Sequence, residues 1–395
     1  MAEQATVPAA SGYTDPPPFS AEAQGQSLTF FPAGKDRRDA LLELVASARK
    51  TLDVCFYIFA EDKVSTSLRD ALCEAASRGV DVTLIIDRFG ASAKDEFLKP
   101  LSEAGGRYHY FSPRLGFRYL IRNHQKMVIA DGERAMFGGF NIEDDYFAPP
   151  EANGWNDLAI LLEGDAVEGL SLWFAKLRGW TENEHAHFRA IRHTVRDWSW
   201  KSEDGEARWL VGGPTRGLST WARSVTRDLV EGEKLDIFMA YFSPPYTLLR
   251  RIARVARKGQ TRLLMAAKSD NGATLGATRS LYNYLLKRGA KIWEFTPCKL
   301  HTKLIVLDDA VYLGSANFDM RSLYLNLEIM LRLEDKALAD KMRAFLEPHY
   351  AASERITPEL HRKRATIWNR IRWSAGWVLV SVIDYTVTRR LNLGI

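Results

Sequence analysis

Residues 123–141 read Asn-His-Gln-Lys-Met-Val-Ile-Ala-Asp-Gly-Glu-Arg-Ala-Met-Phe-Gly-Gly-Phe-Asn, and the chain contains a second version of this stretch. Residues 300–317 read Leu-His-Thr-Lys-Leu-Ile-Val-Leu-Asp-Asp-Ala-Val-Tyr-Leu-Gly-Ser-Ala-Asn. Both copies place a histidine, a lysine and an aspartate at the same spacings, followed by two small residues and an asparagine. Packing alone requires no such polar pattern, so its repetition indicates shared chemistry.

The segments around the two copies follow one order, so the whole neighbourhood of the motif is duplicated. Hydrophobic periodicity and turn residues predict helices and strands in the first half, at 36–50, 52–59, 67–78, 80–86, 97–104, 108–111, 126–130 and 135–137. Similar segments follow later, at 235–242, 248–258, 262–267, 280–288, 291–295, 304–307 and 311–313. Equivalent positions lie 183 residues apart for Asp53 and Asp236, and 177 apart for His124 and His301. The pattern predicts an α/β fold of two similar α/β/α halves, with mostly parallel sheets and an active site at their pseudo-two-fold interface.

Composition divides the chain into four segments. Residues 1–25 are rich in Ala, Ser, Gln and Pro, which is typical of a disordered lead. The first half is expected at 26–200 and the second at 201–355, with a seam in the charged stretch 201–206. Residues 356–395 form a basic, tryptophan-containing amphipathic tail. Such a tail suits either a helix packed on the domain or contact with a membrane interface, and the sequence leaves both open.

Bulk properties exclude several classes of protein. Of the 395 residues, 46% are hydrophobic and 26% charged, which is usual for a folded protein. The three cysteines form no CxxC pair, so we expect neither a disulfide framework nor a zinc site. The N-terminus lacks the pattern of a signal peptide, and no apolar run reaches the length of a spanning helix. A net charge of +5 permits an anionic partner without requiring one.

The repeated motif suits phosphoryl transfer. His124 and Lys126 are two positions apart, as are His301 and Lys303, so each pair shares one face of a strand. A lysine beside an imidazole depresses the imidazole pKa, but it binds a phosphate that the imidazole attacks. One histidine would act as nucleophile and the other as general acid and base. The near-symmetry of the two motifs does not decide which is which.

Further candidate residues follow each motif. Asn141 and Asn317 are expected to bind the substrate phosphate together with Gly139 and Ser315, whose small size permits close approach. The scheme requires no metal or other cofactor, and the sequence has neither an HExxH motif nor a P-loop.

Two carboxylates are candidates for orienting the histidines. Asp157 lies 33 residues after His124, and Glu328 lies 27 residues after His301. Each stands at or before an apolar, strand-like run, which favours a buried and oriented side chain over a surface one.

The duplicated HxKxxxxD motif, followed by GGxN and GSxN, resembles that of the phospholipase D superfamily over roughly residues 30–350. The flanking residues are most similar to bacterial cardiolipin synthases, notably in the stretches Arg122–Lys126, Gly138–Ile142, Trp155–Asp157 and Gly314–Ser322. This resemblance implies a phosphohistidine intermediate with His124 as nucleophile and His301 as general acid and base. It also implies a structural role for Asp131 and Asp308.

The resemblance further implies a transferase that makes cardiolipin from phosphatidylglycerol, or from another phosphatidyl donor and a glycerol-bearing acceptor. Its partners would be anionic phospholipid and the membrane surface, with no nucleic acid, and the oligomeric state stays open. The expected location is the cytoplasmic side of the bacterial inner membrane, as a peripheral protein. Many cardiolipin synthases begin with two membrane-spanning helices, and this chain resembles the shorter type without them. Gln125 stands where arginine is frequent.

Three alternatives remain at this stage. A phospholipase D would use the same site with water as acceptor and release phosphatidic acid. A phosphodiesterase acting on nucleic acid is compatible with the net charge, but the motif lacks interleaved lysines and aromatic residues. A membrane-binding scaffold without activity would normally have lost a catalytic residue, and both motifs here are complete.

Overall fold

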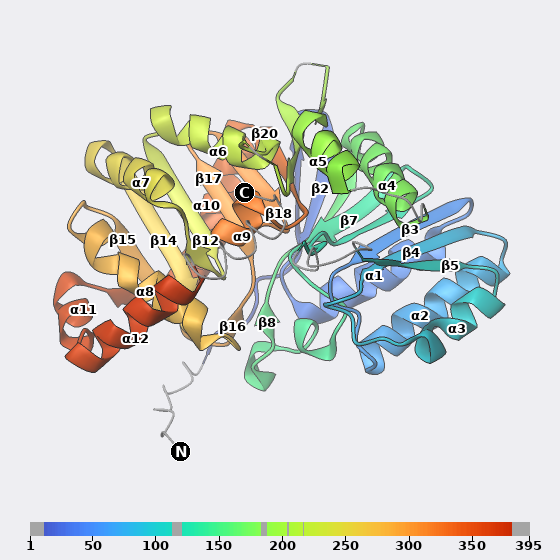
Figure 1. Cartoon of the computed structure of the whole chain (residues 1–395), viewed down its shortest axis with the longest axis horizontal. Coiled ribbons are helices and arrows are strands. Elements are labelled where there is room, and N and C mark those ends of the chain that lie inside the picture. The colour runs from blue at the N-terminus through green and yellow to red at the C-terminus, as the bar shows by residue number, and fades with distance from the viewer. Residues whose placement is uncertain (1–11, 113–120, 183–187, 204, 216, 381–395) are drawn as a thin grey trace.

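The computed structural model describes residues 12–112, 121–182, 188–203, 205–215 and 217–380. Two α/β halves lie side by side, each built on one large sheet (Figure 1). No helix within these described ranges is both long and apolar enough to cross a bilayer.

The eight segments predicted in the first half are present, with small shifts at their ends, among further helices and strands that were not predicted. Its helices are α1 (Gly34–Ser47), α2 (Lys63–Ser77), α3 (Asp95–Glu103), α4 (Ala166–Glu182) and α5 (Phe188–Asp197). Its strands are β1 (Phe19–Ala23), β2 (Gln26–Phe31), β3 (Thr51–Phe56), β4 (Asp81–Asp87), β5 (Arg107–Phe111), β6 (Met127–Ala130), β7 (Arg134–Gly138), β8 (Trp155–Asn156) and β9 (Ala159–Glu163). Two 3-10 turns, η2 (Asp144–Tyr146) and η3 (Pro150–Ala152), precede β8.

The second half repeats this order. Its helices are α6 (Thr220–Glu231), α7 (Tyr246–Lys258), α8 (Gly272–Leu286), α9 (Met320–Tyr324), α10 (Lys336–Ala351), α11 (Pro358–Arg364) and α12 (Ile367–Trp377). Its strands are β10 (Trp200–Lys201), β11 (Ala207–Gly212), β12 (Lys234–Met239), β13 (Phe242–Ser243), β14 (Gln260–Ala266), β15 (Lys291–Phe295), β16 (Lys299–Leu300), β17 (Lys303–Leu307), β18 (Ala310–Gly314), β19 (Phe318–Asp319), β20 (Glu328–Glu334) and β21 (Ser353–Ile356).

The two large sheets have equivalent strand orders but are mixed rather than mostly parallel. The first runs β1-β2-β9-β7-β6-β3-β4-β5, and the second runs β10-β11-β20-β18-β17-β12-β14-β15-β21. Only the pairings β3–β4 and β4–β5, and their counterparts β12–β14 and β14–β15, are parallel within these described sheets. Helical crossovers join those strands, whereas the motif strands form a tight hairpin and must be antiparallel. The expectation of mostly parallel sheets was therefore wrong.

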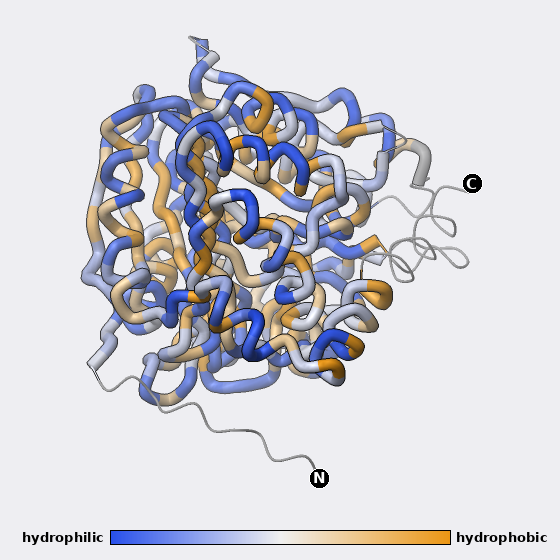
Figure 2. Tube along the Cα trace, turned by 90° about the vertical axis from the view of Figure 1, so that its left-hand side faces the viewer, coloured by the Kyte–Doolittle hydropathy of each residue, from blue (hydrophilic) through white to orange (hydrophobic). Residues whose placement is uncertain are grey.

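Apolar side chains form three clusters that define the layers. The outer clusters pack α1, α2 and α3 on the first sheet and α6, α7 and α8 on the second. The central cluster contains residues of both sheets with α4 and α10, so the two halves share one core. Helices visible at the surface alternate between apolar and polar colouring along their length (Figure 2), as amphipathic helices do. The predicted paired architecture is confirmed.

The predicted hairpin turns carry the aspartates of the two motifs. Asp131 and Asp308 have φ of 57° and 51°, a left-handed conformation that aspartate tolerates better than most residues. The Asp131 carboxylate accepts hydrogen bonds from the backbone N–H groups of residues 49–51, and Asp308 accepts from those of residues 233 and 234. Both side chains thus join the hairpin to the start of the central strand, which fits a structural role.

Two of the expected segment boundaries need correction. The lead predicted as disordered contains β1, which pairs with β2, because Phe19 stacks on Phe30 and packs against Phe345. Residues 1–11 lie outside the described residues. The first strand of the second sheet, β10, begins at Trp200 and pairs with β11, so the second half begins one residue before the expected boundary at 201. In the tail, α11 and α12 are helices, with Trp373 of α12 buried; residues 381–395 lie outside the described part.

Candidate active site

Short backbone pairings between the halves bring the two motifs together. Leu300, just before His301, pairs in parallel with Asn156 of the first half. At the equivalent position before the first motif, a parallel β-bridge joins Asn123, just before His124, to Leu327 of the second half. The His124 N–H donates to the Leu327 carbonyl at 2.9 Å, and the His301 N–H donates to the Asn156 carbonyl at 2.8 Å. Each histidine is therefore held by the backbone of the opposite half.

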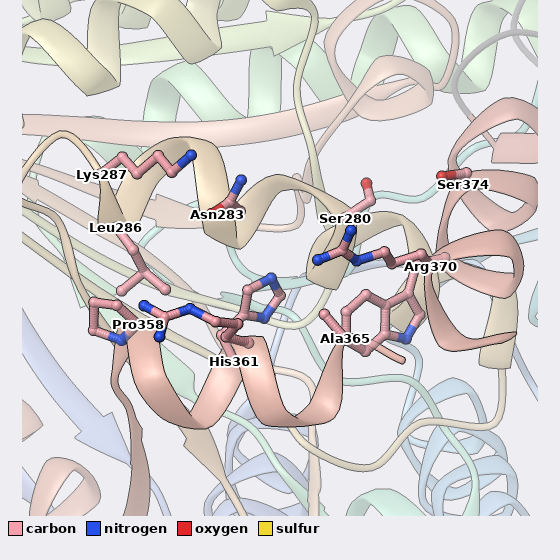
Figure 3. Close-up of a pocket in the computed structure, with 11 residues that line it drawn as sticks. Ser280, Asn283, Leu286, Lys287, Pro358, His361, Ala365, Arg370 and Ser374 are labelled. Carbon is pink, nitrogen blue, oxygen red and sulfur yellow. The ribbon is translucent and has the colours of Figure 1, made fainter. Parts of the chain in front are cut away.

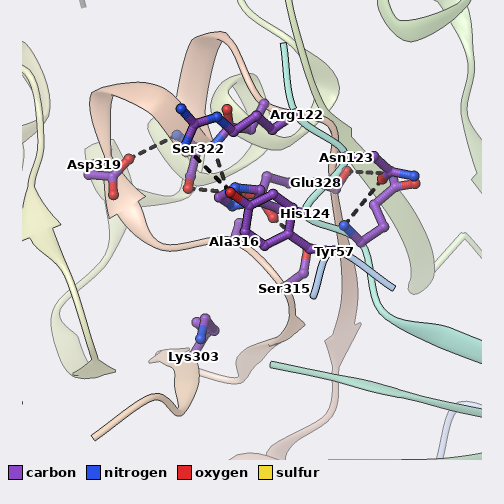
Figure 4. A network of polar contacts seen from close by, with 12 residues as sticks. Tyr57, Arg122, Asn123, His124, Lys303, Ser315, Ala316, Asp319, Ser322 and Glu328 are labelled. Carbon is purple, nitrogen blue, oxygen red and sulfur yellow. Dashed lines mark hydrogen bonds and ion pairs between the residues drawn. The ribbon is translucent and has the colours of Figure 1, made fainter. Parts of the chain in front are cut away.

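His124 lies between an aromatic ring and a carboxylate (Figure 4). Its Nδ1 is 3.3 Å from Glu328 Oε1, and its ring centroid is 4.0 Å from that of Tyr57. Asn326 Nδ2 is 3.4 Å from the same Nδ1. The opposite nitrogen, Nε2, is buried and has no hydrogen-bond partner among the described residues. With Nδ1 facing the carboxylate, Nε2 presents its lone pair to the site.

His301 has a similar but more enclosed position. Its Nδ1 is 2.6 Å from Asp157 Oδ2 and also 2.6 Å from Lys303 Nζ. Its Nε2 is 3.4 Å from the Tyr146 hydroxyl, and the ring meets that of Trp155 edge-on at 5.3 Å. A proton on Nδ1 donated to the Asp157 carboxylate leaves Nε2 to exchange protons with the site.

The carboxylates are paired across the halves, not within them. The spacing along the chain associates Asp157 with His124 and Glu328 with His301, but the contacts are the reverse. The reason is geometric: β8 pairs with β16, so Asp157 follows a strand that lies beside the second motif. The positions of both carboxylates fit the predicted orienting role. Asp157 contacts His301, and Glu328 contacts His124.

The two lysines are buried beside the histidine backbones. Lys126 Nζ donates to the His124 carbonyl, and Lys303 Nζ donates to the His301 carbonyl. Lys126 Nζ also lies 5.5 Å from the centroid of the Tyr57 ring. Each ammonium carries more protons than these contacts use, so both can donate to an anion.

The small residues support the carboxylates. Gly139 lies against Asp157, and a Cβ added there would overlap Asp157 Oδ1. The Ser315 hydroxyl donates to Glu328 Oε2 at 2.6 Å. Direct contact of Gly139 and Ser315 with a phosphate stays a prediction, because their visible contacts are to the two carboxylates.

Two asparagines complete the predicted set. Asn141 is buried and bonded at both ends, since Oδ1 accepts from the Ile58 N–H at 3.2 Å and Nδ2 donates to the Tyr146 hydroxyl at 2.8 Å. Asn317 Oδ1 and Asn326 Oδ1 are buried without a partner among the described residues. Buried polar atoms are normally paired, so these oxygens and His124 Nε2 indicate a polar ligand.

Other residues at the site were not singled out from the sequence. Arg37 of α1 is fully buried; its guanidinium donates to the carbonyl of Asp157 at 2.6 Å and also to that of Tyr146. Tyr57 and Tyr146 contact the two histidines. Arg37 looks in sequence like any charged residue of an amphipathic helix, so no pattern distinguishes it.

Electrostatics at the site favour neutral imidazoles and charged carboxylates. Burial lowers the pKa of His124 to about 4, against the opposing effect of Glu328. Burial, followed by Lys303, lowers the pKa of His301 to about 4. Burial also lowers the pKa of Lys303 to about 7. Although burial opposes ionisation of Asp157, Lys303 and His301 hold its pKa below the usual range.

This arrangement defines a phospholipase D-type enzyme, with one histidine-lysine motif from each half meeting at one site. The family model described as "Cardiolipin synthase, PLD-like domain" matches residues 41–177 and 229–349, more than half of the chain. The chain therefore belongs to this family and is a phosphatidyltransferase of the phospholipase D type.

Curated relatives agree with this assignment, and a solved structure shares the fold. The major cardiolipin synthase ClsA of Bacillus subtilis (strain 168) is 29% identical over 373 residues, covering 91% of this chain and 76% of that protein. Cardiolipin synthase A of Pseudomonas aeruginosa (strain LESB58) is 29% identical over 340 residues, covering 83% and 68%. The phosphatidylserine synthase of Haemophilus influenzae Rd KW20 superposes with a TM-score of 0.68 at 14% identity, covering 93% of this chain and 97% of that one. The last comparison shows the fold alone.

Proposed function

We propose that the protein transfers a phosphatidyl group from phosphatidylglycerol to the headgroup glycerol of a second phosphatidylglycerol, producing cardiolipin and free glycerol. The observation that carries this proposal is the unpartnered, buried Nε2 of His124, which faces a site containing a second histidine and two buried lysines. Family membership supplies the substrate class, since the similar proteins named above are cardiolipin synthases.

In the first step His124 Nε2 attacks phosphorus, and a bond forms between nitrogen and phosphorus. The bond from phosphorus to the headgroup oxygen breaks, and His301 Nε2 donates a proton to that oxygen, which leaves as glycerol. Lys126 and Lys303 stabilise the charge that develops on the non-bridging oxygens. Because His124 Nδ1 faces Glu328 at 3.3 Å, the positive charge that forms on this ring is stabilised.

The second step reverses the roles. Neutral His301 removes a proton from the glycerol hydroxyl of the acceptor lipid, and the resulting oxygen attacks phosphorus. The bond from nitrogen to phosphorus breaks, and its electron pair returns to His124. We assign Asn317 Oδ1, which is buried and lacks a partner among the described residues, the role of accepting a hydrogen bond from a glycerol hydroxyl.

Substrate binding favours uptake of a proton from solvent by His301. In the free protein its pKa of about 4 makes the ring neutral at pH 7. A phosphodiester anion placed beside the ring favours the imidazolium and raises this pKa. Binding of the phosphodiester therefore shifts His301 toward the protonated form, and Asp157 at 2.6 Å stabilises the charged ring.

The product mixture tests the function. Purified protein is incubated with phosphatidylglycerol vesicles, and lipids are separated by chromatography. We expect cardiolipin and glycerol in equal amounts, with both lost in His124→Ala and retained in a His193→Ala control, because His193 is exposed on α5. Phosphatidic acid as the sole product would identify a hydrolase, and salt-sensitive DNA cleavage lost in His124→Ala would identify a nuclease.

The same proposal places the protein at a membrane surface as a peripheral protein, on the cytoplasmic side of a bacterial inner membrane. Its proposed substrate is a bilayer lipid, and the similarity to cardiolipin synthases supports association with a membrane. Fractionation of cells should recover the protein with membranes and release it at high salt. Recovery that requires detergent would contradict peripheral attachment.

A further inference from the structure

A pocket separate from the histidine site lies between α8, α11 and α12 (Figure 3). Its volume is about 620 Å³, which is within the range of small-ligand sites. Polar and cationic side chains dominate its lining, including Asn283, Lys287, Arg362, Arg370 and Ser374. No residue that lines the pocket is acidic.

Among the described residues, arginines near the pocket form ion pairs with carboxylates, whereas three cations that line the pocket do not. Arg364 of α11 donates to both oxygens of Glu354, and Arg279 of α8 forms an ion pair with Glu294 at 2.8 Å. In the part of the chain that the structure describes, Lys287, Arg362 and Arg370 form no hydrogen bond or ion pair through their side chains. Three cations around one hollow attract a phosphate group, although Glu359 of α11 also interacts electrostatically with Arg362.

The outward face of α12 beside this pocket is apolar. Ile367, Trp368 and Ile371 are 77%, 80% and 55% exposed, and Val378 continues the face at 41%. At 100° per residue these side chains lie on one side of the helix, next to Arg370 and Ser374. Trp373 and Gly376 lie on the opposite side, against α8. We call Ile367, Trp368, Ile371 and Val378 the apolar stripe.

We propose that this pocket and the apolar stripe form a docking site for an anionic phospholipid in the bilayer, distinct from the catalytic site. The pocket would hold the lipid phosphate, and the stripe would enter the level of the headgroups. An amphipathic helix with a tryptophan on its apolar face and arginines beside it has the chemistry of an interfacial helix. A free phosphate ester would satisfy the cations but leave the stripe in water.

The position of the site suits a protein that acts on bilayer lipid. In Figure 1, α12 lies toward the same side of the molecule as β8 and β16. These strands lead directly into Asp157 and His301. Docking through α12 would therefore keep the catalytic site near the membrane that supplies its substrate.

Vesicle flotation with matched variants tests whether the positive charges of Arg362 and Arg370 bind anionic lipid. Phosphatidylcholine vesicles are compared with and without phosphatidylglycerol. We expect the double variant Arg362→Gln/Arg370→Gln to bind phosphatidylglycerol vesicles at least about tenfold more weakly than the native chain. The control Arg254→Gln/Arg257→Gln removes the same charge from the exposed face of α7 and should change binding less than about threefold. Equal losses in the two double variants would overturn the proposal.

The stripe is tested by Trp368→Ser, with Leu172→Ser as control because Leu172 is exposed on α4. We expect only Trp368→Ser to weaken vesicle binding. Sedimentation velocity gives the competing result: loss of a dimer in Trp368→Ser, with unchanged vesicle binding, would assign the stripe to a second copy of the chain.

Two further measurements distinguish the proposal from its alternatives. Turnover of a soluble short-chain phosphatidylglycerol should be unchanged in the Arg362→Gln/Arg370→Gln variant, which distinguishes a failure of docking from a failure of catalysis. Inorganic phosphate is added in a thermal-shift measurement. If phosphate stabilises the native chain but not this variant, while both bind vesicles equally, the pocket is a site for free phosphate and the proposal is wrong.

Discussion

At the scale of single residues, the position of Asp157 depends on the absence of a side chain at Gly139. Any Cβ at residue 139 would overlap Asp157 Oδ1 and approach Lys303 Cδ. The carboxylate contacts His301 at 2.6 Å, so a shift of Asp157 changes the orientation of that histidine. Adding a single methyl group at residue 139 should therefore disturb the orientation of His301 through Asp157.

Gly139→Ala should therefore lower kcat by roughly 10²-fold or more, because it displaces the group that orients His301. Gly179→Ala is the control, since a Cβ at this helical position meets nothing within 4 Å. That control should leave kcat unchanged and raise stability by up to about 1 kcal/mol. Steady-state kinetics on a soluble substrate measures both. A Gly139→Ala enzyme with normal kcat would show that Asp157 does not position His301.

The pKa values of the site predict the pH dependence of kcat/KM for a phosphatidyl donor with a p-nitrophenol leaving group, which needs no general acid and therefore depends on His124 and Lys303 but not on protonated His301. His124 must be neutral to attack, and its pKa of about 4 places the acid limb near pH 4 rather than 6.5. Lys303 must be charged, and its pKa of about 7 places the alkaline limb near pH 7. Activity should thus be highest between these limits. In Lys303→Arg the alkaline limb should move upward, because arginine stays protonated; an unmoved limb would contradict the assignment to Lys303.

At the scale of elements, the two hairpins hold each motif strand in register with the central strand. The Asp131 carboxylate accepts three backbone N–H groups, and these contacts lower its pKa although partial burial raises it. Its counterpart Asp308 has the same kind of contacts. Removing either side chain leaves backbone donors without their acceptor.

Asp131→Ala should lower the free energy of unfolding by about 1–3 kcal/mol, since it removes several hydrogen bonds at once. The folded fraction should keep its normal specific activity, because Asp131 does not contact either histidine. Asp309→Ala, at an exposed position of the other hairpin turn, serves as the control and should change little. Chemical denaturation and activity measured on the same samples give both quantities. Loss of activity without loss of stability would assign Asp131 a catalytic role.

The elements show what sequence could and could not provide. The hairpins, the helices around them and the duplication were predictable, because short-range periodicity and turn residues specify them. The direction of most strand pairings was not, since pairing partners such as β2 and β9 are far apart in sequence. The strand β1 was missed because a proline-rich composition outweighed the packing of Phe19 on Phe30, which is visible only in the fold.

At the scale of the whole molecule, the site forms because each half supplies backbone and side-chain contacts to the histidine of the other half. The two histidine-lysine pairs were predictable from the repeated motif, and backbone pairings between the halves bring the two motifs together. Which carboxylate serves which histidine was not predictable, because chain spacing cannot show that β8 pairs with β16 across the interface. The exchange means that Asp157 should act with His301, and Glu328 with His124.

The central claim is that His124 forms the covalent intermediate and His301 handles protons. A phosphatidyl donor with a p-nitrophenol leaving group needs no general acid, so the first step then requires only the nucleophile. Rapid mixing should give a burst of one p-nitrophenol per enzyme in the native chain, in His301→Ala and in Asp157→Asn, with the phosphatidyl group on His124 by peptide mass mapping. His124→Ala should give no burst. A burst that persists in His124→Ala and disappears in His301→Ala would contradict the account.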